Sequence, residues 1–309
     1  MNSNKSYYTA KRSKLVRKVS FYKFLINYIT HTLLRSLAKR NSLKGYPKLL
    51  SLPSDYIGQH IISNGLYEEH LLKGLFDKFF TKYLIEFSEN TVLDIGANIG
   101  NHSCFFSNYF NSVLAFEPND TVFAILKANI VINNIKNITA KNFGLSDKDA
   151  ELTFIENTDG NLGGSGFCKK SHEMRGIRKL LPVRKGDTII EGEFGNNQIK
   201  LIKIDVEGHE LAVLQGLKNT IHKFHPIILF ETNTSEGEHG GQVIFDFLKD
   251  SGYKYFYSVE TMKSTLRFRF LRILERVFKG YNIYAKEIYA PENRPYSLIV
   301  ATHSEMHFE

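Results

Sequence analysis

The chain has 309 residues, of which 42% are hydrophobic and 23% charged. This composition supports a folded core and excludes a globally disordered chain, a collagen-like repeat and a simple coiled coil. The two cysteines, Cys104 and Cys168, exclude a disulfide-rich secreted scaffold and a cysteine-ligated zinc site, and they favour a reducing, cytoplasmic compartment. No run of about 18 apolar residues is present, so the sequence predicts no transmembrane helix.

The formal net charge of +8 is concentrated at the N-terminus. Residues 1–54 hold twelve Lys or Arg residues and no Asp or Glu, which leaves the rest of the chain with 28 basic and 32 acidic residues. Apolar residues from Leu15 to Leu37 recur at steps of three or four, as on one face of a helix. The pattern therefore predicts a basic amphipathic extension over 1–54 that precedes a domain over 55–309.

A second basic cluster with helical apolar spacing occupies residues 263–279, and it predicts a helical insertion at about 261–290. A helix with one cationic and one apolar face suits the surface of an anionic membrane. Packing on the domain or on another subunit is the alternative, and the sequence leaves the oligomeric state open. Nucleic acid is the least favoured partner, because the body of the chain is acidic. We thus expect a cytoplasmic protein that is peripheral to the inner face of the membrane.

From about residue 90, short apolar strands alternate with helical stretches. The predicted strands are 91–95, 112–116, 138–142, 152–155, 200–205, 227–231, 253–259 and 297–301. The predicted helices are 100–109, 119–133, 210–217 and 245–251; residues 157–178 are expected to form a loop, and residues 41–90 to be helical and cover the sheet. This alternation predicts an α/β fold, with a doubly wound, mostly parallel, Rossmann-like sheet and an N-terminal helical extension.

The most informative segment is VLDIGANIGNHS, where a buried strand leads into a turn with Gly96, Asn98 and Gly100. Glycines there permit unusual backbone angles and a close approach of a ligand. Glu117 ends the next strand, where an acid can accept both ribose hydroxyls of an adenosine ligand. The turn departs from the dinucleotide pattern, and Asp94 just before it suits a positively charged group better than a pyrophosphate. S-Adenosylmethionine, with its ammonium and sulfonium, is therefore the favoured cofactor.

These segments also resemble a known family. VLDIGANIGNHS, AFEP, LIKIDVEGHELAVLQGL and IILFETN, in this order, are similar to the FkbM family of class I S-adenosylmethionine-dependent methyltransferases. The resemblance covers residues 90–260 and 296–302. It implies O-methylation of a sugar or another hydroxyl-bearing metabolite, as in glycan or polyketide biosynthesis. It also implies that Phe143 packs on the adenine ring and that Ser146 or Asp147 binds the adenine amino group.

A second group of polar residues follows two later strands. Asp205, Glu207 and His209 follow one strand and Glu231 ends the next, so we expect them near the cofactor at the shared edge of the sheet. Methyl transfer needs an in-line geometry and a base for the hydroxyl proton. We predict Asp205, Glu207 and His209 as catalytic residues, Asp205 also as a cofactor ligand, and Glu231 and Asn233 as acceptor-binding residues. For His209, a purely structural role at a helix start is the alternative.

Magnesium is a weaker possibility for the carboxylates of this group, since the spacing typical of a dedicated metal site is missing. The leading interpretation is thus an O-methyltransferase that acts on a hydroxyl of a sugar, glycan or glycolipid. The alternatives are a methyltransferase of a small secondary metabolite or of nucleic acid, and a non-catalytic cofactor-binding protein. The nucleic-acid alternative is disfavoured because the fourth strand is followed by IDVEG, and not by an Asn/Asp-Pro-Pro-aromatic motif.

Overall fold

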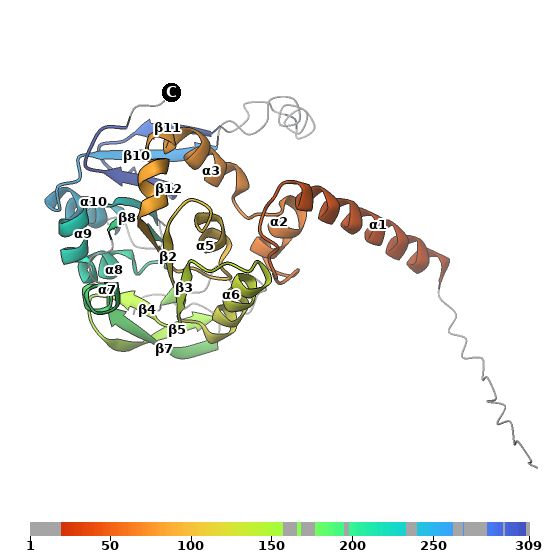
Figure 1. Ribbon diagram of the computed structural model, residues 1–309. Coiled ribbons are helices and arrows are strands. Elements are labelled where there is room, and N and C mark those ends of the chain that lie inside the picture. Colours follow the sequence, from red (N-terminus) through yellow and green to blue (C-terminus); the bar gives the residue numbers. More distant parts are fainter. Residues whose placement is uncertain are drawn as a thin grey trace, which may run out of the picture.

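A computed structural model describes residues 20–156, 166–167, 177–194, 198–232, 240–261, 268, 283–292 and 294–306. The strands of its main sheet are β1 (Thr91–Ile95), β2 (Ser112–Phe116), β3 (Ile138–Lys141), β8 (Ile199–Ile204), β9 (Ile227–Thr232), β10 (Tyr255–Thr261), β11 (Ile283–Glu287) and β12 (Tyr296–Thr302). They are arranged in the order β11-β10-β12-β9-β8-β1-β2-β3 (Figure 1). The strands β3, β2, β1, β8 and β9 are parallel to one another. The remaining strands, β12, β10 and β11, pair antiparallel. The predicted α/β fold class is confirmed.

The strand order reverses between β1 and β8. From β1 the chain continues to β2 and β3 on one side of the sheet, and it later adds β8 and β9 on the other side. In open α/β sheets, ligands bind outside the carboxyl ends of the strands at such a reversal. The topology therefore places the candidate site at the ends of β1 and β8.

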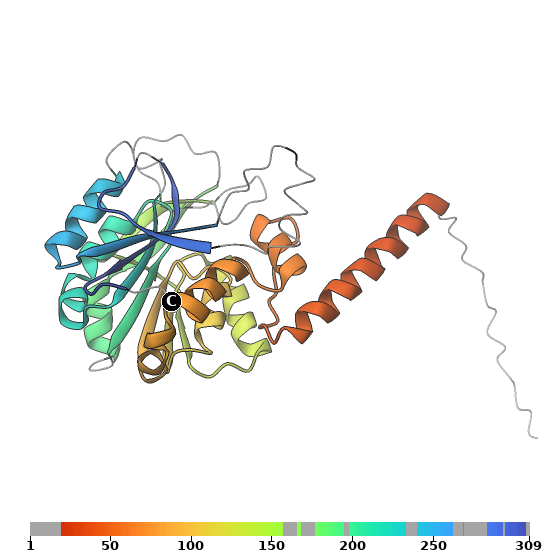
Figure 2. The ribbon, with the colours of Figure 1, turned by 90° about the horizontal axis from the view of Figure 1, so that it is seen from above.

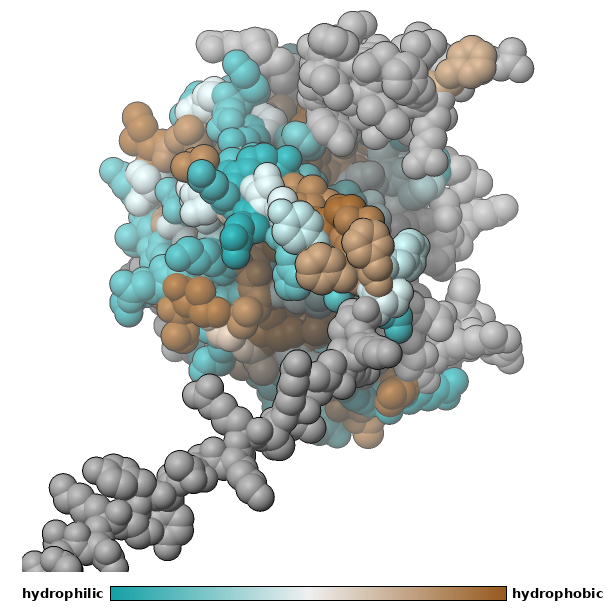
Figure 3. All heavy atoms as spheres, turned by 90° about the vertical axis from the view of Figure 1, so that its right-hand side faces the viewer, coloured by the Kyte–Doolittle hydropathy of each residue, from teal (hydrophilic) through white to brown (hydrophobic). Residues whose placement is uncertain are grey.

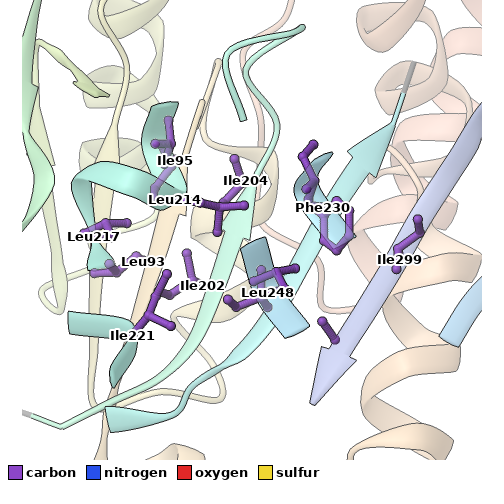
Figure 4. Close-up of a cluster of buried hydrophobic side chains, with 14 of the residues drawn as sticks. Leu93, Ile95, Ile202, Ile204, Leu214, Leu217, Ile221, Phe230, Leu248 and Ile299 are labelled. Atoms are coloured by element: carbon purple, nitrogen blue, oxygen red, sulfur yellow. The ribbon is translucent and has the colours of Figure 1, made fainter. Parts of the chain in front are cut away.

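Helices cover both faces of the sheet. The helices on one face are α7 (Gly186–Phe194), α8 (Glu210–Gly216), α9 (Lys218–Phe224) and α10 (Gly240–Asp250). Alternate strand residues point toward them, and Figure 4 shows Leu93, Ile95, Ile202 and Ile204 in this cluster. Because side chains alternate along a strand, the residues between these apolar ones must face the opposite side.

The opposite face carries a core rich in phenylalanine. Phe76 packs against Phe80, Phe87, Phe105 and Phe106, with ring centroids 5.2–6.1 Å apart. The elements on this side are α3 (Glu69–Gly74), the π-helix η1 (Leu75–Phe79), the 3-10 helix η2 (Thr81–Tyr83), α4 (Leu84–Glu89) and α5 (Asn101–Phe106), with α6 (Asp120–Ile132) beside β3. The predicted helical cover is confirmed, but it consists of several short helices.

A second, four-stranded sheet was not predicted. Its strands are β4 (Gly144–Ser146), β5 (Ala150–Glu156), β6 (Gly166–Phe167) and β7 (Ile177–Lys185), in the order β4-β7-β5-β6. The predicted loop over 157–178 is wrong where β6 lies and where β7 begins, and the rest of that loop falls outside the described residues. The signal for β7 in the sequence is the spacing of Leu181 and Val183, two apolar residues separated by one residue, and both are buried in the structure.

The predicted insertion at 261–290 is also wrong at its C-terminal end, because Ile283–Glu287 forms β11 on the edge strand β10. Ile283 and Ala285 pack on the phenylalanine-rich core, so half-buried and exposed side chains alternate along this segment as in a strand. Of residues 262–282, which include the second basic cluster, the structure describes only Phe268.

The N-terminal helix α1 (Phe21–Leu43) projects away from the sheet (Figures 1 and 2). It confirms the predicted helix from residue 21 onward and has no buried residue. Its C-terminal end contacts α2 (Tyr56–Asn64): Arg40 donates to the Ser63 carbonyl oxygen, and Asn41 Nδ2 donates to the Ile62 carbonyl oxygen at 3.1 Å. Figure 3 faces the side from which α1 projects and shows exposed hydrophobic side chains there. None of the described helices is both long and apolar enough to cross a membrane.

Candidate functional site

Gly96 brings the end of β1 against the end of β8. Its φ is +79°, and a Cβ atom on it would lie 1.8 Å from the carbonyl oxygen of Asp205. The Asp205 amide in turn donates to the Ile95 carbonyl oxygen at 3.0 Å. Only glycine fits at position 96. The sequence analysis expected a ligand to approach the backbone closely here, but the group that does so is the backbone of Asp205.

The rest of the turn aims backbone groups at Glu117. Asn98 has a left-handed φ of +49°, and its amide donates to Glu117 Oε2 at 3.0 Å. Gly100, with φ of +85°, starts α5 and lies so close to Leu126 that an added Cβ would be 2.4 Å from its Cδ1. The turn thus holds the carboxylate that follows β2 in a fixed position.

Glu117 is buried, with 7% of its surface exposed. Its second oxygen, Oε1, accepts from the Asn119 amide at 2.8 Å. Burial raises its pKa to about 7, although the two amide hydrogen bonds oppose that rise. A carboxylate oxygen has two lone pairs, so each Glu117 oxygen can also accept a ligand hydroxyl. This is the arrangement that a ribose diol requires.

The residues after β3 form the next part of the cleft. Phe143 is half-buried, and its ring centroid lies 5.9 Å from that of Phe116 at the end of β2. Asn142 Nδ2 donates to Asp120 Oδ1 at 2.5 Å, while the buried Asn142 Oδ1 accepts no hydrogen bond from the described residues. An unsatisfied buried acceptor beside an aromatic ring suits the amino group of adenine. The sequence analysis missed Asn142, although it adjoins the predicted Phe143.

Ser146 and His209 contact each other, with His209 Nε2 2.9 Å from Ser146 Oγ. Ser146 Oγ also lies 3.0 Å from Asp147 Oδ1, so this predicted adenine partner binds side chains of the chain itself. His209 precedes α8, and Glu207 has a left-handed φ of +49°. Glu210 Oε1 accepts from the Gly208 amide at 2.9 Å, which closes the turn before the helix.

A buried lysine connects the carboxylates at the ends of β1 and β8. Lys203 Nζ lies 3.0 Å from Asp205 Oδ2, 3.5 Å from Asp94 Oδ1 and 3.2 Å from the Gly96 carbonyl oxygen. Asp94 is fully buried and also accepts from Ser103 Oγ at 2.5 Å, but its Oδ1 accepts no hydrogen bond among the described residues. The adjacent carboxylates raise the pKa of Lys203, in opposition to its burial. The signal for Lys203 was present in the sequence, as a lysine inside an apolar strand.

Glu231 completes the group on the same face of the sheet. Burial, and then repulsion from Asp205 and Glu68, raises its pKa to about 9. It lines a small cavity together with Lys203, Glu68 and His102, and His102 Nε2 lies 3.3 Å from Glu68 Oε2. The sequence analysis assigned no role to either residue: His102 lies within the VLDIGANIGNHS segment but was not singled out, and no motif marked Glu68.

The other predicted acceptor residue, Asn233, lies beyond the described end of β9. Within the described residues, no three or more His, Cys, Asp or Glu side chains are grouped to hold a metal ion. Two acceptors at this edge of the sheet can still take a ligand: the Glu117 carboxylate, whose oxygens have lone pairs to spare, and the Asn142 oxygen. With the partly exposed Asp205, they fit a ligand with a ribose diol, an aromatic amine and a cationic end.

Comparisons with known proteins identify the family of the chain. The family described as Methyltransferase FkbM domain matches residues 94–255. Hexuronic acid methyltransferase AglP of Haloferax volcanii is 34% identical over 148 residues, which cover 47% of this chain and 58% of that protein. Methyltransferase 1 of Beauveria bassiana is 26% identical over 171 residues, which cover 48% and 67%. The crystal structure of methyltransferase FkbM from Methylobacillus flagellatus is 16% identical with a TM-score of 0.44, and the match covers 87% of this chain and 57% of that one. The chain therefore spans little more than half of AglP.

Proposed function

The chain belongs to the FkbM methyltransferase family, and from that premise we propose that it transfers a methyl group from S-adenosylmethionine to a hydroxyl group of a sugar, glycan or glycolipid. The observation that carries the proposal is Glu117, a buried carboxylate held by two backbone amides at the reversal of the strand order. The similarity to a protein named as a hexuronic acid methyltransferase supports a saccharide as the acceptor class.

The cofactor would contact the residues along the ends of β1, β2 and β3. Glu117 would bind the ribose, Phe143 the adenine ring and Asn142 the adenine amino group. Asp205 and the turn from Gly96 to Gly100 would hold the methionine part with its cationic end, and the buried pair of Asp94 and Lys203 would support them. When bound, S-adenosylmethionine supplies an electrophilic methyl group on a sulfonium.

The protein's own task is to orient the acceptor oxygen and to take its proton. Asp205 is close enough to Glu231 to contribute to its raised pKa, and both carboxylates would face the acceptor. The sequence favoured His209 as base, with Glu207 beside it. We propose His102 as a second candidate base, because its imidazole lines a cavity together with Lys203 and Glu231. His209, which contacts Ser146, stays the candidate that the sequence offered.

We further propose that α1 binds the cytoplasmic face of an anionic membrane, where lipid-linked saccharides would be methylated. Phe21, Phe24 and Tyr28 each expose more than 60% of their surface, and the segment 1–54 is purely basic. Exposed aromatic side chains and positive charge together favour an anionic interface. Sedimentation with phosphatidylglycerol vesicles, but not with phosphatidylcholine vesicles, is the expected result. Equal recovery of a chain that lacks residues 1–45 would contradict it.

Two measurements test the methyltransferase proposal. Titration calorimetry with S-adenosylmethionine should show binding at one site, and Glu117→Ala should weaken it. Incubation with methyl-labelled cofactor and a panel of glycans should then give a product 14 Da heavier than the acceptor. A cofactor that does not bind the wild-type protein contradicts the proposal; binding without transfer to any acceptor supports the non-catalytic alternative.

A further inference from the structure

A second, larger cavity lies beside the candidate site. Its volume is about 400 Å³. One wall is aromatic: Tyr56 and His60 on α2 have ring centroids 4.5 Å apart, and Tyr67 lies 6.3 Å from Tyr56. The opposite wall is formed by Glu260 at the end of β10 and Arg294 before β12. None of these residues was predicted to have a functional role.

This cavity is adjacent to the small cavity of the candidate site. Glu68 and Leu71 line both the large cavity and the small cavity that contains Lys203 and Glu231. The charges of Glu68 and Glu231 act on Tyr67 and, together with its burial, raise the pKa of its hydroxyl. Tyr67 thus stays protonated at neutral pH and can donate a hydrogen bond to a ligand. A molecule in the large cavity would have one end within reach of the carboxylate cluster.

We propose that the large cavity binds the acceptor, and that the acceptor there is an uncharged saccharide unit. This inference rests on the proposed methyltransferase function and specifies its substrate. A sugar ring presents apolar C–H groups that can stack on aromatic side chains, and hydroxyls that carboxylates and tyrosine hydroxyls can bind. A volume of about 400 Å³ is within the ordinary range for a small-molecule site.

The charges of the lining indicate that the sugar is neutral. Among the described lining residues Arg294 is the only Lys or Arg, and its guanidinium already binds Glu260 at 2.6 Å and Glu292 at 2.7 Å. Burial lowers the pKa of His70, which favours its neutral form. A hexuronate carboxylate would therefore meet glutamates, and the described lining offers it no lysine or arginine that is not already paired. In this respect the cavity differs from what the name of the AglP protein would suggest for its acceptor.

The position of α2 also connects this cavity with the N-terminal helix. α1 ends in hydrogen bonds to the C-terminal turn of α2, and α2 carries the aromatic wall. A neutral sugar could reach the cavity from solution or as the head group of a glycolipid. Both sources share the same recognition chemistry, so the experiment must separate them.

Saturation-transfer NMR on the full-length protein can measure binding without turnover. The soluble probes are p-nitrophenyl β-glucoside and p-nitrophenyl β-glucuronide, which differ by one carboxylate. The lipid probe is monoglucosyl diacylglycerol in phosphatidylcholine vesicles, compared with vesicles that lack it. The test variant is Tyr56→Ala, and the matched control is Tyr289→Ala, a tyrosine with 76% exposure that does not line the cavity.

We expect the glucoside to bind at least tenfold more tightly than the glucuronide, and Tyr56→Ala to weaken glucoside binding about fivefold to tenfold, as for the loss of one aromatic contact. Tyr289→Ala should leave it unchanged. Binding of either neutral probe, the glucoside or the glucolipid, supports the large cavity as the acceptor site. The probe that binds more tightly shows whether the sugar comes from solution or from a glycolipid. Equal effects of the two variants, a preference for the glucuronide, or no binding of any neutral probe overturns it. If S-adenosylmethionine still binds in that case, the methyltransferase proposal survives and only the acceptor site is wrong.

Discussion

Asp94 on β1 and Lys203 on β8 are register partners on neighbouring parallel strands, and Lys203 Nζ lies 3.5 Å from Asp94 Oδ1. Both side chains face the phenylalanine-rich side of the sheet, since their neighbours Leu93, Ile95 and Ile202 face the other side. Asp205 then gives the lysine a second carboxylate at 3.0 Å. A buried charge is stable only when it is paired, so these three residues form one unit at the centre of the candidate site.

Replacement of Lys203 should therefore be costly. Lys203→Met leaves the buried Asp94 uncompensated, and we expect it to lower the free energy of unfolding by about 3–5 kcal/mol. Lys200 is a matched control on the same strand: it pairs with Glu86 at the surface, and Lys200→Met should cost less than about 1 kcal/mol. Urea denaturation of both variants measures the difference. Similar losses in the two variants would contradict a central role for Lys203.

Cofactor affinity should rise with pH between 6 and 8. Glu117 has a pKa of about 7 in the ligand-free protein, and only its ionised form can accept hydrogen bonds from both ribose hydroxyls through both oxygens. The ionised fraction rises about tenfold over this range, and affinity should rise by the same factor. Calorimetry at several pH values tests this, with Glu117→Gln as the control because the ligand's own titration is common to both proteins. Parallel pH profiles would rule out Glu117 as the ribose ligand.

Gly96→Ala should disrupt the site by a steric effect alone. The new Cβ would lie 1.8 Å from the Asp205 carbonyl oxygen, on a backbone with φ of +79°. We expect a loss of about 2–4 kcal/mol of stability and at least a tenfold loss of cofactor affinity. Gly192 in α7 has no atom within 4 Å of its added Cβ, so Gly192→Ala should be neutral or stabilise the protein by up to about 1 kcal/mol. Thermal unfolding and calorimetry on this pair test the claim, which a wild-type-like Gly96→Ala variant would refute.

The two candidate bases can be separated by kinetics. His102→Ala should lower kcat by about a hundredfold or more, since it removes the imidazole that lines the small cavity. His209→Ala should lower kcat less than tenfold, because that imidazole contacts Ser146. Cofactor affinity, measured in parallel, should change less than threefold in His102→Ala. The reverse order of the two kcat values would identify His209 as the base.

Stability should fall as the pH rises toward 9. The pKa of Glu231 is raised from 4.5 to about 9, so the folded protein binds this proton more tightly than the unfolded chain. The resulting stabilisation is complete below about pH 4.5 and is lost as the pH rises through about 9. Between pH 6 and pH 9 the wild type should lose on the order of 4 kcal/mol more than Glu231→Gln, which stays neutral throughout. Denaturant titrations at both pH values measure the difference, and an identical loss in the two proteins would exclude a raised pKa at Glu231.

Local patterns were sufficient for the parallel half of the sheet. The five parallel strands are short apolar runs separated by helical stretches, and the Gly96 turn lies where the sequence placed it. The strands β4, β6, β7 and β11 were missed. β4 and β6 have only three and two residues, and β7 and β11 carry charged residues, so their alternation is weak unless the partner strand is known. A strand that depends on its partner for burial leaves little trace in its own composition.

The sequence by itself determined the family, the order of the parallel strands of the main sheet, and the glycines and acids that follow β1 and β2, because each of these is encoded within a dozen neighbouring residues. Only the tertiary structure decided that Lys203 compensates Asp94, that His102 meets Glu68, and that α2 and β10 enclose a cavity. These residues are far apart along the chain. Their charges and surfaces acquire a function only when the packing of helices on one face of the sheet removes them from water and brings them together.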